Sequence, residues 1–174
     1  MFFYSCCMDE KKSFSELIKD FNKMYGLPVN DKPSLPSSKR LENFRKVLAE
    51  EFEEINKVID KCKEASMILN NEKDSVFPRE MINSDYIASV LTEMTDWIGD
   101  MIVYLTSEST KYGINMDQAL RIIMDSNFSK LGADGKPIYD ERGKVMKGPN
   151  YWKPEPKIKE FLKKQLEEWH PMAH

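Results

Sequence analysis

The chain has 174 residues, of which 41% are apolar and 32% charged, and its formal net charge at pH 7 is −3. This length suits one globular domain with a sizeable core, and the apolar content excludes a disordered chain. The negative charge argues against nucleic-acid binding, and no apolar run reaches the ~20 residues of a membrane span. The chain has three cysteines, too few and too widely spaced for a disulfide framework. Its two histidines lie near the C-terminus, so the cysteines and histidines do not form a zinc-site pattern. We therefore expect a cytoplasmic protein without nucleic-acid or membrane partners.

Apolar residues recur at three- and four-residue steps in several stretches, which predicts helices. The first helix runs from Phe14 to Met24, and Ser13 with Glu16 forms a capping box at its start. Two long helices follow over residues 39–69 and 84–112. Because consecutive helices joined by a short connection usually pack side by side, we expect an all-α bundle built around a long antiparallel pair.

Two shorter helices complete the expected bundle, over residues 116–126 and 156–169. Between them, residues 132–149 carry four glycines and two prolines around two short apolar pieces. This pattern is typical of a small β-hairpin or an ordered loop. The sequence therefore predicts about five helices with one irregular insertion.

The carboxylates of the first long helix lie beside its apolar stripe. On an ideal helix with Leu48 at zero, Glu51 falls at about −60° and Glu54 at about −120°. The first position is inside the stripe, and the second is at its edge beside Val47. Two acids one turn apart therefore share the side of the helix that adjoins the core.

Three acids of the second long helix gather in the same way. With Met94 at zero, Glu93, Asp100 and Asp96 fall at about −100°, −120° and −160°. Like charges that share one side of a helix repel each other by about 0.2–0.5 kcal/mol per pair. Oxygen ligands from facing helices chelate Mg²⁺ or Mn²⁺, which would explain the cluster. The simpler explanation is a solvated helix face.

Three ordered groups of residues, spread over about residues 20 to 153, carry a family resemblance. They are Phe21–Pro28 with Arg40 and Glu50–Ile55, then Glu93–Tyr104 with Tyr112–Ile114, then Ser126–Leu131 with Asp134–Pro137 and Gly143–Tyr151. Together they resemble the all-α nucleoside triphosphate pyrophosphohydrolases, which include the MazG-like and phosphoribosyl-ATP pyrophosphohydrolase-like proteins.

The resemblance implies a helical bundle completed as a homodimer or homotetramer. It also implies hydrolysis of a nucleoside triphosphate to the monophosphate and pyrophosphate, with Mg²⁺ as cofactor. We place the corresponding domain at residues 13–153, after a frayed segment 1–12. A C-terminal helix within 154–174 is expected to pack on the same domain.

Carried over by position, Glu51 and Glu54 match the first metal-ligand pair of the family. Glu93 and Asp96 match the second pair as written. A metal in such a site lowers the pKa of a bound water, and Glu54 is our candidate for the catalytic base that accepts the proton.

A second alignment of the metal ligands stays open. In many MazG-like proteins the Asp of the second pair lies thirteen residues before the Gly that ends the helix. Counting back from Gly113 gives Asp100, and the expected Glu position is then Trp97. Either Glu93 and Asp96 form the pair, or Asp96 and Asp100 serve one turn later.

The expected substrate contacts come mostly from the region after the long helices. Amide, ammonium and guanidinium groups there suit phosphate oxygens: Asn127, Lys130, Arg142, Lys144 and Lys147. The first two match a family position near the substrate, whereas the rest have a solvated basic loop as their simpler explanation. Trp97 and Tyr151 are candidates to stack on the base, although aromatic side chains are more often part of a core.

Two other functions compete with this interpretation. The closest enzymatic alternative is a phosphoribosyl-ATP pyrophosphohydrolase. The other is a non-catalytic nucleotide-binding or helical interaction module, which could keep the apolar stripes without a working metal site.

Overall fold

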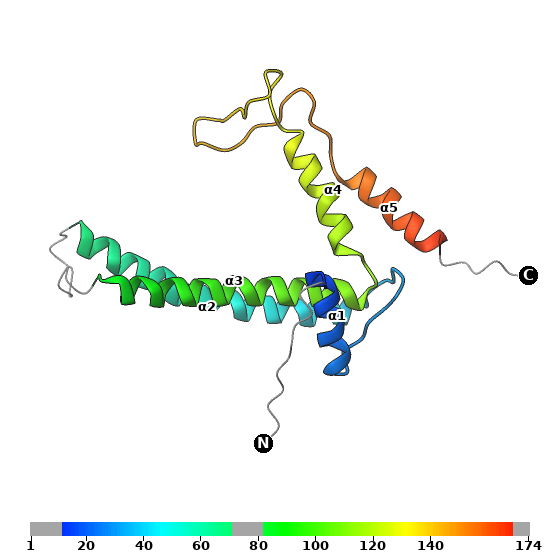
Figure 1. The fold of residues 1–174 in the computed structure, drawn as a ribbon, viewed down its shortest axis with the longest axis horizontal. Coiled ribbons are helices and arrows are strands. Elements are labelled where there is room, and N and C mark those ends of the chain that lie inside the picture. Colours follow the sequence, from blue (N-terminus) through cyan, green and yellow to red (C-terminus); the bar gives the residue numbers. More distant parts are fainter. Residues whose placement is uncertain (1–11, 71–81, 169–174) are drawn as a thin grey trace, which may run out of the picture. The chain divides into compact units, whose positions relative to one another are not determined.

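The computed structural model describes residues 12–70 and 82–168 and is all-α in these ranges (Figure 1). Its helices are α1 (Phe14–Met24), α2 (Ser38–Leu69), α3 (Ser84–Lys111), α4 (Met116–Phe128) and α5 (Glu155–Glu167). The predicted five-helix fold class is confirmed. No helix in the described ranges is both long and apolar enough to cross a bilayer.

The described residues fall into two compact units, and the division lies within α3. The first unit holds residues 12–35 and 106–168, and the second holds 36–70 and 82–105. The domain boundaries expected from the sequence stay a prediction.

The helix ends follow the local capping chemistry. Ser13 Oγ accepts a hydrogen bond from the Glu16 amide, and the Glu16 carboxylate accepts one from the Ser13 amide, which is the predicted capping box. Ser37 caps α2, so this helix begins one residue earlier than expected. The expected end of the last helix at Trp169 lies outside the described residues, as does almost all of the segment expected to be frayed.

The interior of the first unit is partly polar. The Asn22 side chain is completely buried, and its amide donates to the Ser107 carbonyl oxygen at 3.2 Å. The Ser107 hydroxyl donates back to Asn22 Oδ1 at 2.7 Å. Since a buried amide is costly unless it is hydrogen-bonded, this reciprocal pair fixes α1 against the end of α3. The buried apolar side chains of this unit are Ile18, Ala119 and Phe161.

The turn after α3 depends on one glycine. Gly113 has a φ of +67°, and a Cβ added there would lie 2.1 Å from the Lys32 carbonyl oxygen. The connector before α2 runs along this turn, where the Ser34 amide donates to the Tyr112 carbonyl oxygen at 3.0 Å. A side chain at Gly113 is therefore excluded both by backbone conformation and by contact.

The irregular insertion expected over residues 132–149 is an ordered loop with a minimal hairpin. Tyr139 and Val145 form an isolated antiparallel bridge, and the Met146 amide donates to the Ile138 carbonyl oxygen at 2.7 Å. A glycine at position 143, with a φ of +75°, makes the turn between the two arms. The hairpin is too short to count as a pair of strands.

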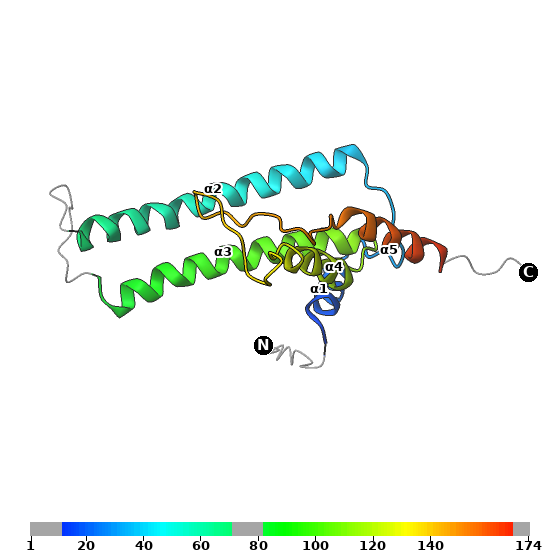
Figure 2. The same cartoon turned by 90° about the horizontal axis from the view of Figure 1, so that it is seen from above.

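The second unit is the long helix pair. Figure 2 shows α2 and this part of α3 running side by side in opposite directions. Val58 and Ile68 of α2 are buried, whereas many large apolar side chains of the pair are more than 40% exposed. These exposed residues are Leu41, Phe52, Ile59, Leu69, Ile87, Leu91, Ile98, Ile102 and Leu105. Apolar side chains exposed singly are common on protein surfaces, whereas nine on one helix pair mark a candidate interaction surface.

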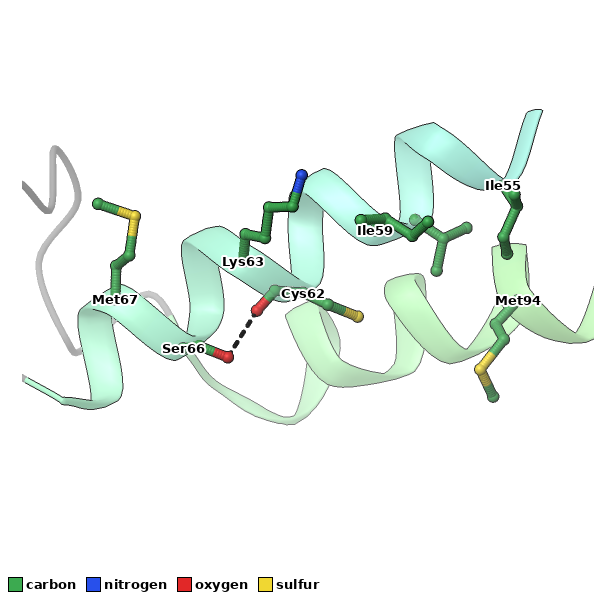
Figure 3. A pocket seen from close by; sticks show the side chains of 8 residues that line it. Ile55, Ile59, Cys62, Lys63, Ser66, Met67 and Met94 are labelled. Carbon is green, nitrogen blue, oxygen red and sulfur yellow. Dashed lines mark hydrogen bonds between the residues drawn. The ribbon is translucent and has the colours of Figure 1, made fainter. Parts of the chain in front are cut away.

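Part of this apolar surface forms an open groove of about 640 Å³. Figure 3 shows that α2 supplies almost all of its lining, and that Met94 reaches it from α3. Ile55 lies with Met94 at one end of the groove, Ile59 and Cys62 lie toward its middle, and Met67 lies at the other end. We name this surface the apolar groove; its lining residues are Ile55, Val58, Ile59, Cys62, Lys63, Ser66, Met67 and Met94.

We expect Gly113→Ala to lower the melting temperature by about 8 °C or more, because it adds a steric clash to left-handed strain. Gly135→Ala is the matched control, since Gly135 has a φ of +75° but no heavy atom within 4 Å of an added Cβ. The control should lose at most about 4 °C. Thermal unfolding followed by circular dichroism tests this, and equal losses in both variants would contradict the role of the Lys32 contact.

Candidate active site

The predicted acids of the two long helices all lie in the second unit. On α2, Glu51 is half-buried and Glu54 is exposed. On α3, Glu93 is half-buried, whereas Asp96 and Asp100 are exposed. Three- and four-residue steps keep the acids of each helix on one side, as the helical angles predict.

Trp97 ties the two helices together beside these acids. Its indole Nε1 donates a hydrogen bond to the Glu51 carbonyl oxygen at 2.8 Å. Its ring also meets Phe52 edge-on, with centroids 6.4 Å apart and planes at 61°. The indole nitrogen is therefore engaged in the protein, and only the faces of the ring are available for a base.

Glu51 lies in an electrostatically unfavourable place. Burial, followed by the negative charges of Glu54 and Asp100, raises the pKa of its carboxyl above the ordinary value of 4.5. The nearby Tyr104 hydroxyl opposes only part of this pKa rise. Burial and the same acids also raise the pKa of Tyr104. Glu51, Glu54 and Asp100 thus interact across the two helices.

Glu54 also lines a cavity of about 440 Å³ in the second unit. From α3, Glu93, Asp96 and Trp97 form the opposite wall. We name this space the acidic cavity; its lining residues are Glu54, Lys57, Val58, Lys61, Glu93, Asp96 and Trp97. The sequence-predicted acids are therefore divided between Glu51 with Asp100 and this cavity, with Glu54 common to both.

Sequence reasoning missed the two lysines of the acidic cavity. Lys61 forms an ion pair with Glu93, and both side chains are more than a third exposed. Lys57 lies one turn earlier on the same side of α2 and also lines the cavity. The signal was available, because both lysines follow Glu54 at helical steps, at +3 and +7.

The residues present suit a divalent cation in their chemistry. Glu51 Oε2 is buried and has no hydrogen-bond partner in the part of the chain that the structure describes. A cation would supply that partner and relieve the repulsion from Glu54 and Asp100. As the side chains stand, no group of three acids, cysteines or histidines among the described residues is positioned to hold an ion. Binding therefore requires the carboxylates to converge by rotamer changes.

The remaining predicted site residues belong to the first unit. Lys130 Nζ donates to Asn127 Oδ1 at 2.7 Å at the end of α4. In the loop that follows, Asp140 Oδ1 accepts hydrogen bonds from the Arg142 and Lys144 amides at 3.0 and 2.8 Å. These contacts order the loop and leave the charged ends of Arg142 and Lys144 at the surface.

Tyr151 is half-buried, and the Lys147 ammonium lies 4.7 Å from the centre of its ring. One face of that ring is therefore covered by a cation. Of the two aromatic candidates for base stacking, Trp97 lines a cavity together with the acids, and Tyr151 belongs to the first unit.

Similarity to known proteins is found among solved structures. No protein-family model matches the chain. No curated protein matches it either. Among solved structures, the chain is similar to a "putative NTP pyrophosphohydrolase" from Exiguobacterium sp. 255-15, with 21% identity and a TM-score of 0.46. The match covers 91% of this chain and 99% of the other.

We expect Glu51→Gln to raise the melting temperature of the metal-free protein at pH 7 by about 1–2 °C. Because the pKa of Glu51 is higher in the folded state than in the unfolded state, the protonated carboxyl stabilises the folded state below pH 4.5. This stabilisation is lost as the pH rises through the pKa that Glu51 has in the folded state. The gain from the amide should therefore be largest at neutral pH and vanish near pH 4. Glu64→Gln, at an exposed position of α2 outside the cluster, should show no such pH dependence. A lower melting temperature for Glu51→Gln at pH 7 would refute the repulsion.

Proposed function

We propose that the protein hydrolyses nucleoside triphosphates to the monophosphate and pyrophosphate with Mg²⁺. The observation that carries the proposal is the buried Oε2 of Glu51, which has no hydrogen-bond partner among the described residues and lies near the negative charges of Glu54 and Asp100. Carboxylates arranged in this way suit a divalent cation that also coordinates the phosphate oxygens of a substrate. The resemblance of the motifs to the all-α pyrophosphohydrolases supports the same reaction.

Glu51, Glu54 and Asp100, together with Asp96 of the acidic cavity, would hold the metal. When bound, Mg²⁺ neutralises phosphate charge and lowers the pKa of a coordinated water. The role that we give Glu54 is that of the base, since it is exposed and lines the cavity. The water oxygen bonds to the α-phosphorus, and Glu54 takes the water proton. The bond from the α-phosphorus to the oxygen that bridges it to the β-phosphorus breaks, and pyrophosphate leaves with that oxygen.

The expected products distinguish this reaction from that of a phosphatase. With Mg²⁺ and a panel of nucleoside triphosphates, the protein should release monophosphate and pyrophosphate, read by chromatography and phosphorus NMR. Glu54→Gln should lower turnover by about 100-fold or more, because the base is lost. The Glu64→Gln control should stay near wild type. Orthophosphate with a diphosphate as the main products would overturn the reaction class, and no product from any triphosphate would favour a binding module.

The same assay separates the two ligand alignments. An amide oxygen brings no charge to a cation, so the variant that removes a direct ligand loses turnover. If Asp100 is that ligand, Asp100→Asn is inactive and Asp96→Asn is only impaired. The reverse result would assign the second pair to Glu93 and Asp96. The influence of Asp100 on Glu51 supports the first outcome.

We also propose that the second unit is completed by another copy of this chain. Its exposed apolar side chains and the apolar groove lie on the same helix pair, and burying them would supply a core that the pair lacks. Light scattering at micromolar concentration should report a homodimer or homotetramer. Ile59→Glu, which places a charge in the apolar groove, should shift the protein toward the monomer, whereas Asn43→Glu at an exposed position of α2 should not. A wild-type monomer would reject the proposal.

A further inference from the structure

The charges of the acidic cavity nearly cancel. Its walls carry three carboxylates, from Glu54, Glu93 and Asp96, and two ammonium groups, from Lys57 and Lys61. The formal charges of these five side chains sum to −1. A divalent cation held beside Glu54 and Asp96 adds two positive charges to this sum, so the cavity attracts an anion more strongly with the metal than without it.

The two lysines are arranged for one extended anion. They lie four residues apart on α2, so their side chains project from the same side of the helix, about 6 Å apart along its axis. The Lys57 ammonium has no hydrogen bond or ion pair to any residue in the ranges 12–70 and 82–168. Among the residues that the structure describes, nothing neutralises this cation on the cavity wall.

Contacts with α3 fix both the side chain and the backbone of Lys61. Its ammonium pairs with Glu93 across the helix pair. Its carbonyl oxygen accepts a hydrogen bond from the Tyr86 hydroxyl at 3.0 Å. Both partners come from α3, so they set the position of Lys61 relative to the facing wall that carries Asp96 and Trp97.

We infer that Lys57 and Lys61 bind the phosphate chain of the substrate in the acidic cavity, and that a divalent cation must be present for them to do so. This inference rests on the proposed function for the identity of the anion as a polyphosphate. Lysine ammonium groups bind phosphate oxygens as point charges with three donors each. In this arrangement Glu93 is a positioning residue that orients Lys61, and the phosphate contacts lie in the same unit as the acids.

The test is calorimetric titration of the full-length protein with inorganic pyrophosphate, with and without Mg²⁺. Wild-type protein should bind pyrophosphate at least about tenfold more tightly with Mg²⁺. Lys57→Met and Lys61→Met should each weaken that binding by about tenfold, since each removes a charge-assisted contact. Lys63→Met is the matched control, because Lys63 lies on the same helix but lines the apolar groove. Its affinity should stay within about twofold of wild type.

The role of Glu93 has its own readout in the same titration. Glu93→Gln removes a negative charge from the cavity, which by itself would strengthen pyrophosphate binding, so weaker binding in this variant reports the lost position of Lys61. We expect that weaker binding, and the double variant with Lys61→Met should bind no more weakly than Lys61→Met alone. Additive losses would show that Glu93 does not act through Lys61. If Lys61→Met does not fold, Lys57→Met still tests the site, since that side chain has no partner to lose among the described residues.

Unchanged pyrophosphate affinity in both lysine variants overturns the inference, as does equal affinity of the wild type with and without Mg²⁺. These failures differ from a failure of the proposed function. If the wild-type protein cleaves triphosphates and the lysine variants bind pyrophosphate as tightly as the wild type, only the lysine site is refuted. Mg²⁺-dependent pyrophosphate binding that the lysine variants lose, in a protein that cleaves no triphosphate, would refute only the hydrolase.

Discussion

The second unit depends on overcoming the repulsion between carboxylates on its two helices. Burial, Glu54 of the same helix and Asp100 of the facing helix raise the pKa of the Glu51 carboxyl, and the charges of Glu51 and Asp100 by themselves push the pair apart. Three polar contacts between described residues hold the pair together: the Trp97 indole on a backbone carbonyl, the ion pair of Lys61 with Glu93, and the Tyr86 hydroxyl on the α2 backbone. Two of the three use main-chain oxygens of α2, which bind the helix without neutralising the acids.

The first unit solves a different problem, because its interior holds polar groups that must find partners. Asn22 and Ser107 satisfy each other, and the Ser126 hydroxyl donates to the Trp152 carbonyl oxygen at 2.8 Å. Such directional contacts permit fewer alternative packings than an apolar core does. The contrast with the exposed apolar residues of α2 and α3 shows how differently one chain can stabilise two groups of helices.

Much of the fold is readable from the sequence, because local patterns determine it. The periodicity of apolar residues located all five helices, and Ser13 with Glu16 located the start of α1 to the residue. The end of α4 was missed by two residues, since nothing after Ser126 signals a stop. The sides on which the acids lie also followed from helical angles. The partners of these acids could not be predicted from the helical angles, because the contact of Lys61 with Glu93 depends on how far one helix is shifted along the other.

The loop that follows α4 is closed at its base. The Gly148 amide donates to the Lys130 carbonyl oxygen at 2.9 Å, and a Cβ at Gly148 would lie 1.9 Å from the Leu131 carbonyl oxygen. The two ends of the loop are thus joined independently of what lies between them. Doubling the length of a flexible loop closed in this way costs only about 0.6 kcal/mol. Residues between Gly132 and Met146 can therefore vary in number and chemistry during evolution, or be replaced together by another loop. The backbone contacts at the base of the loop would still join the segments that lead to α4 and α5.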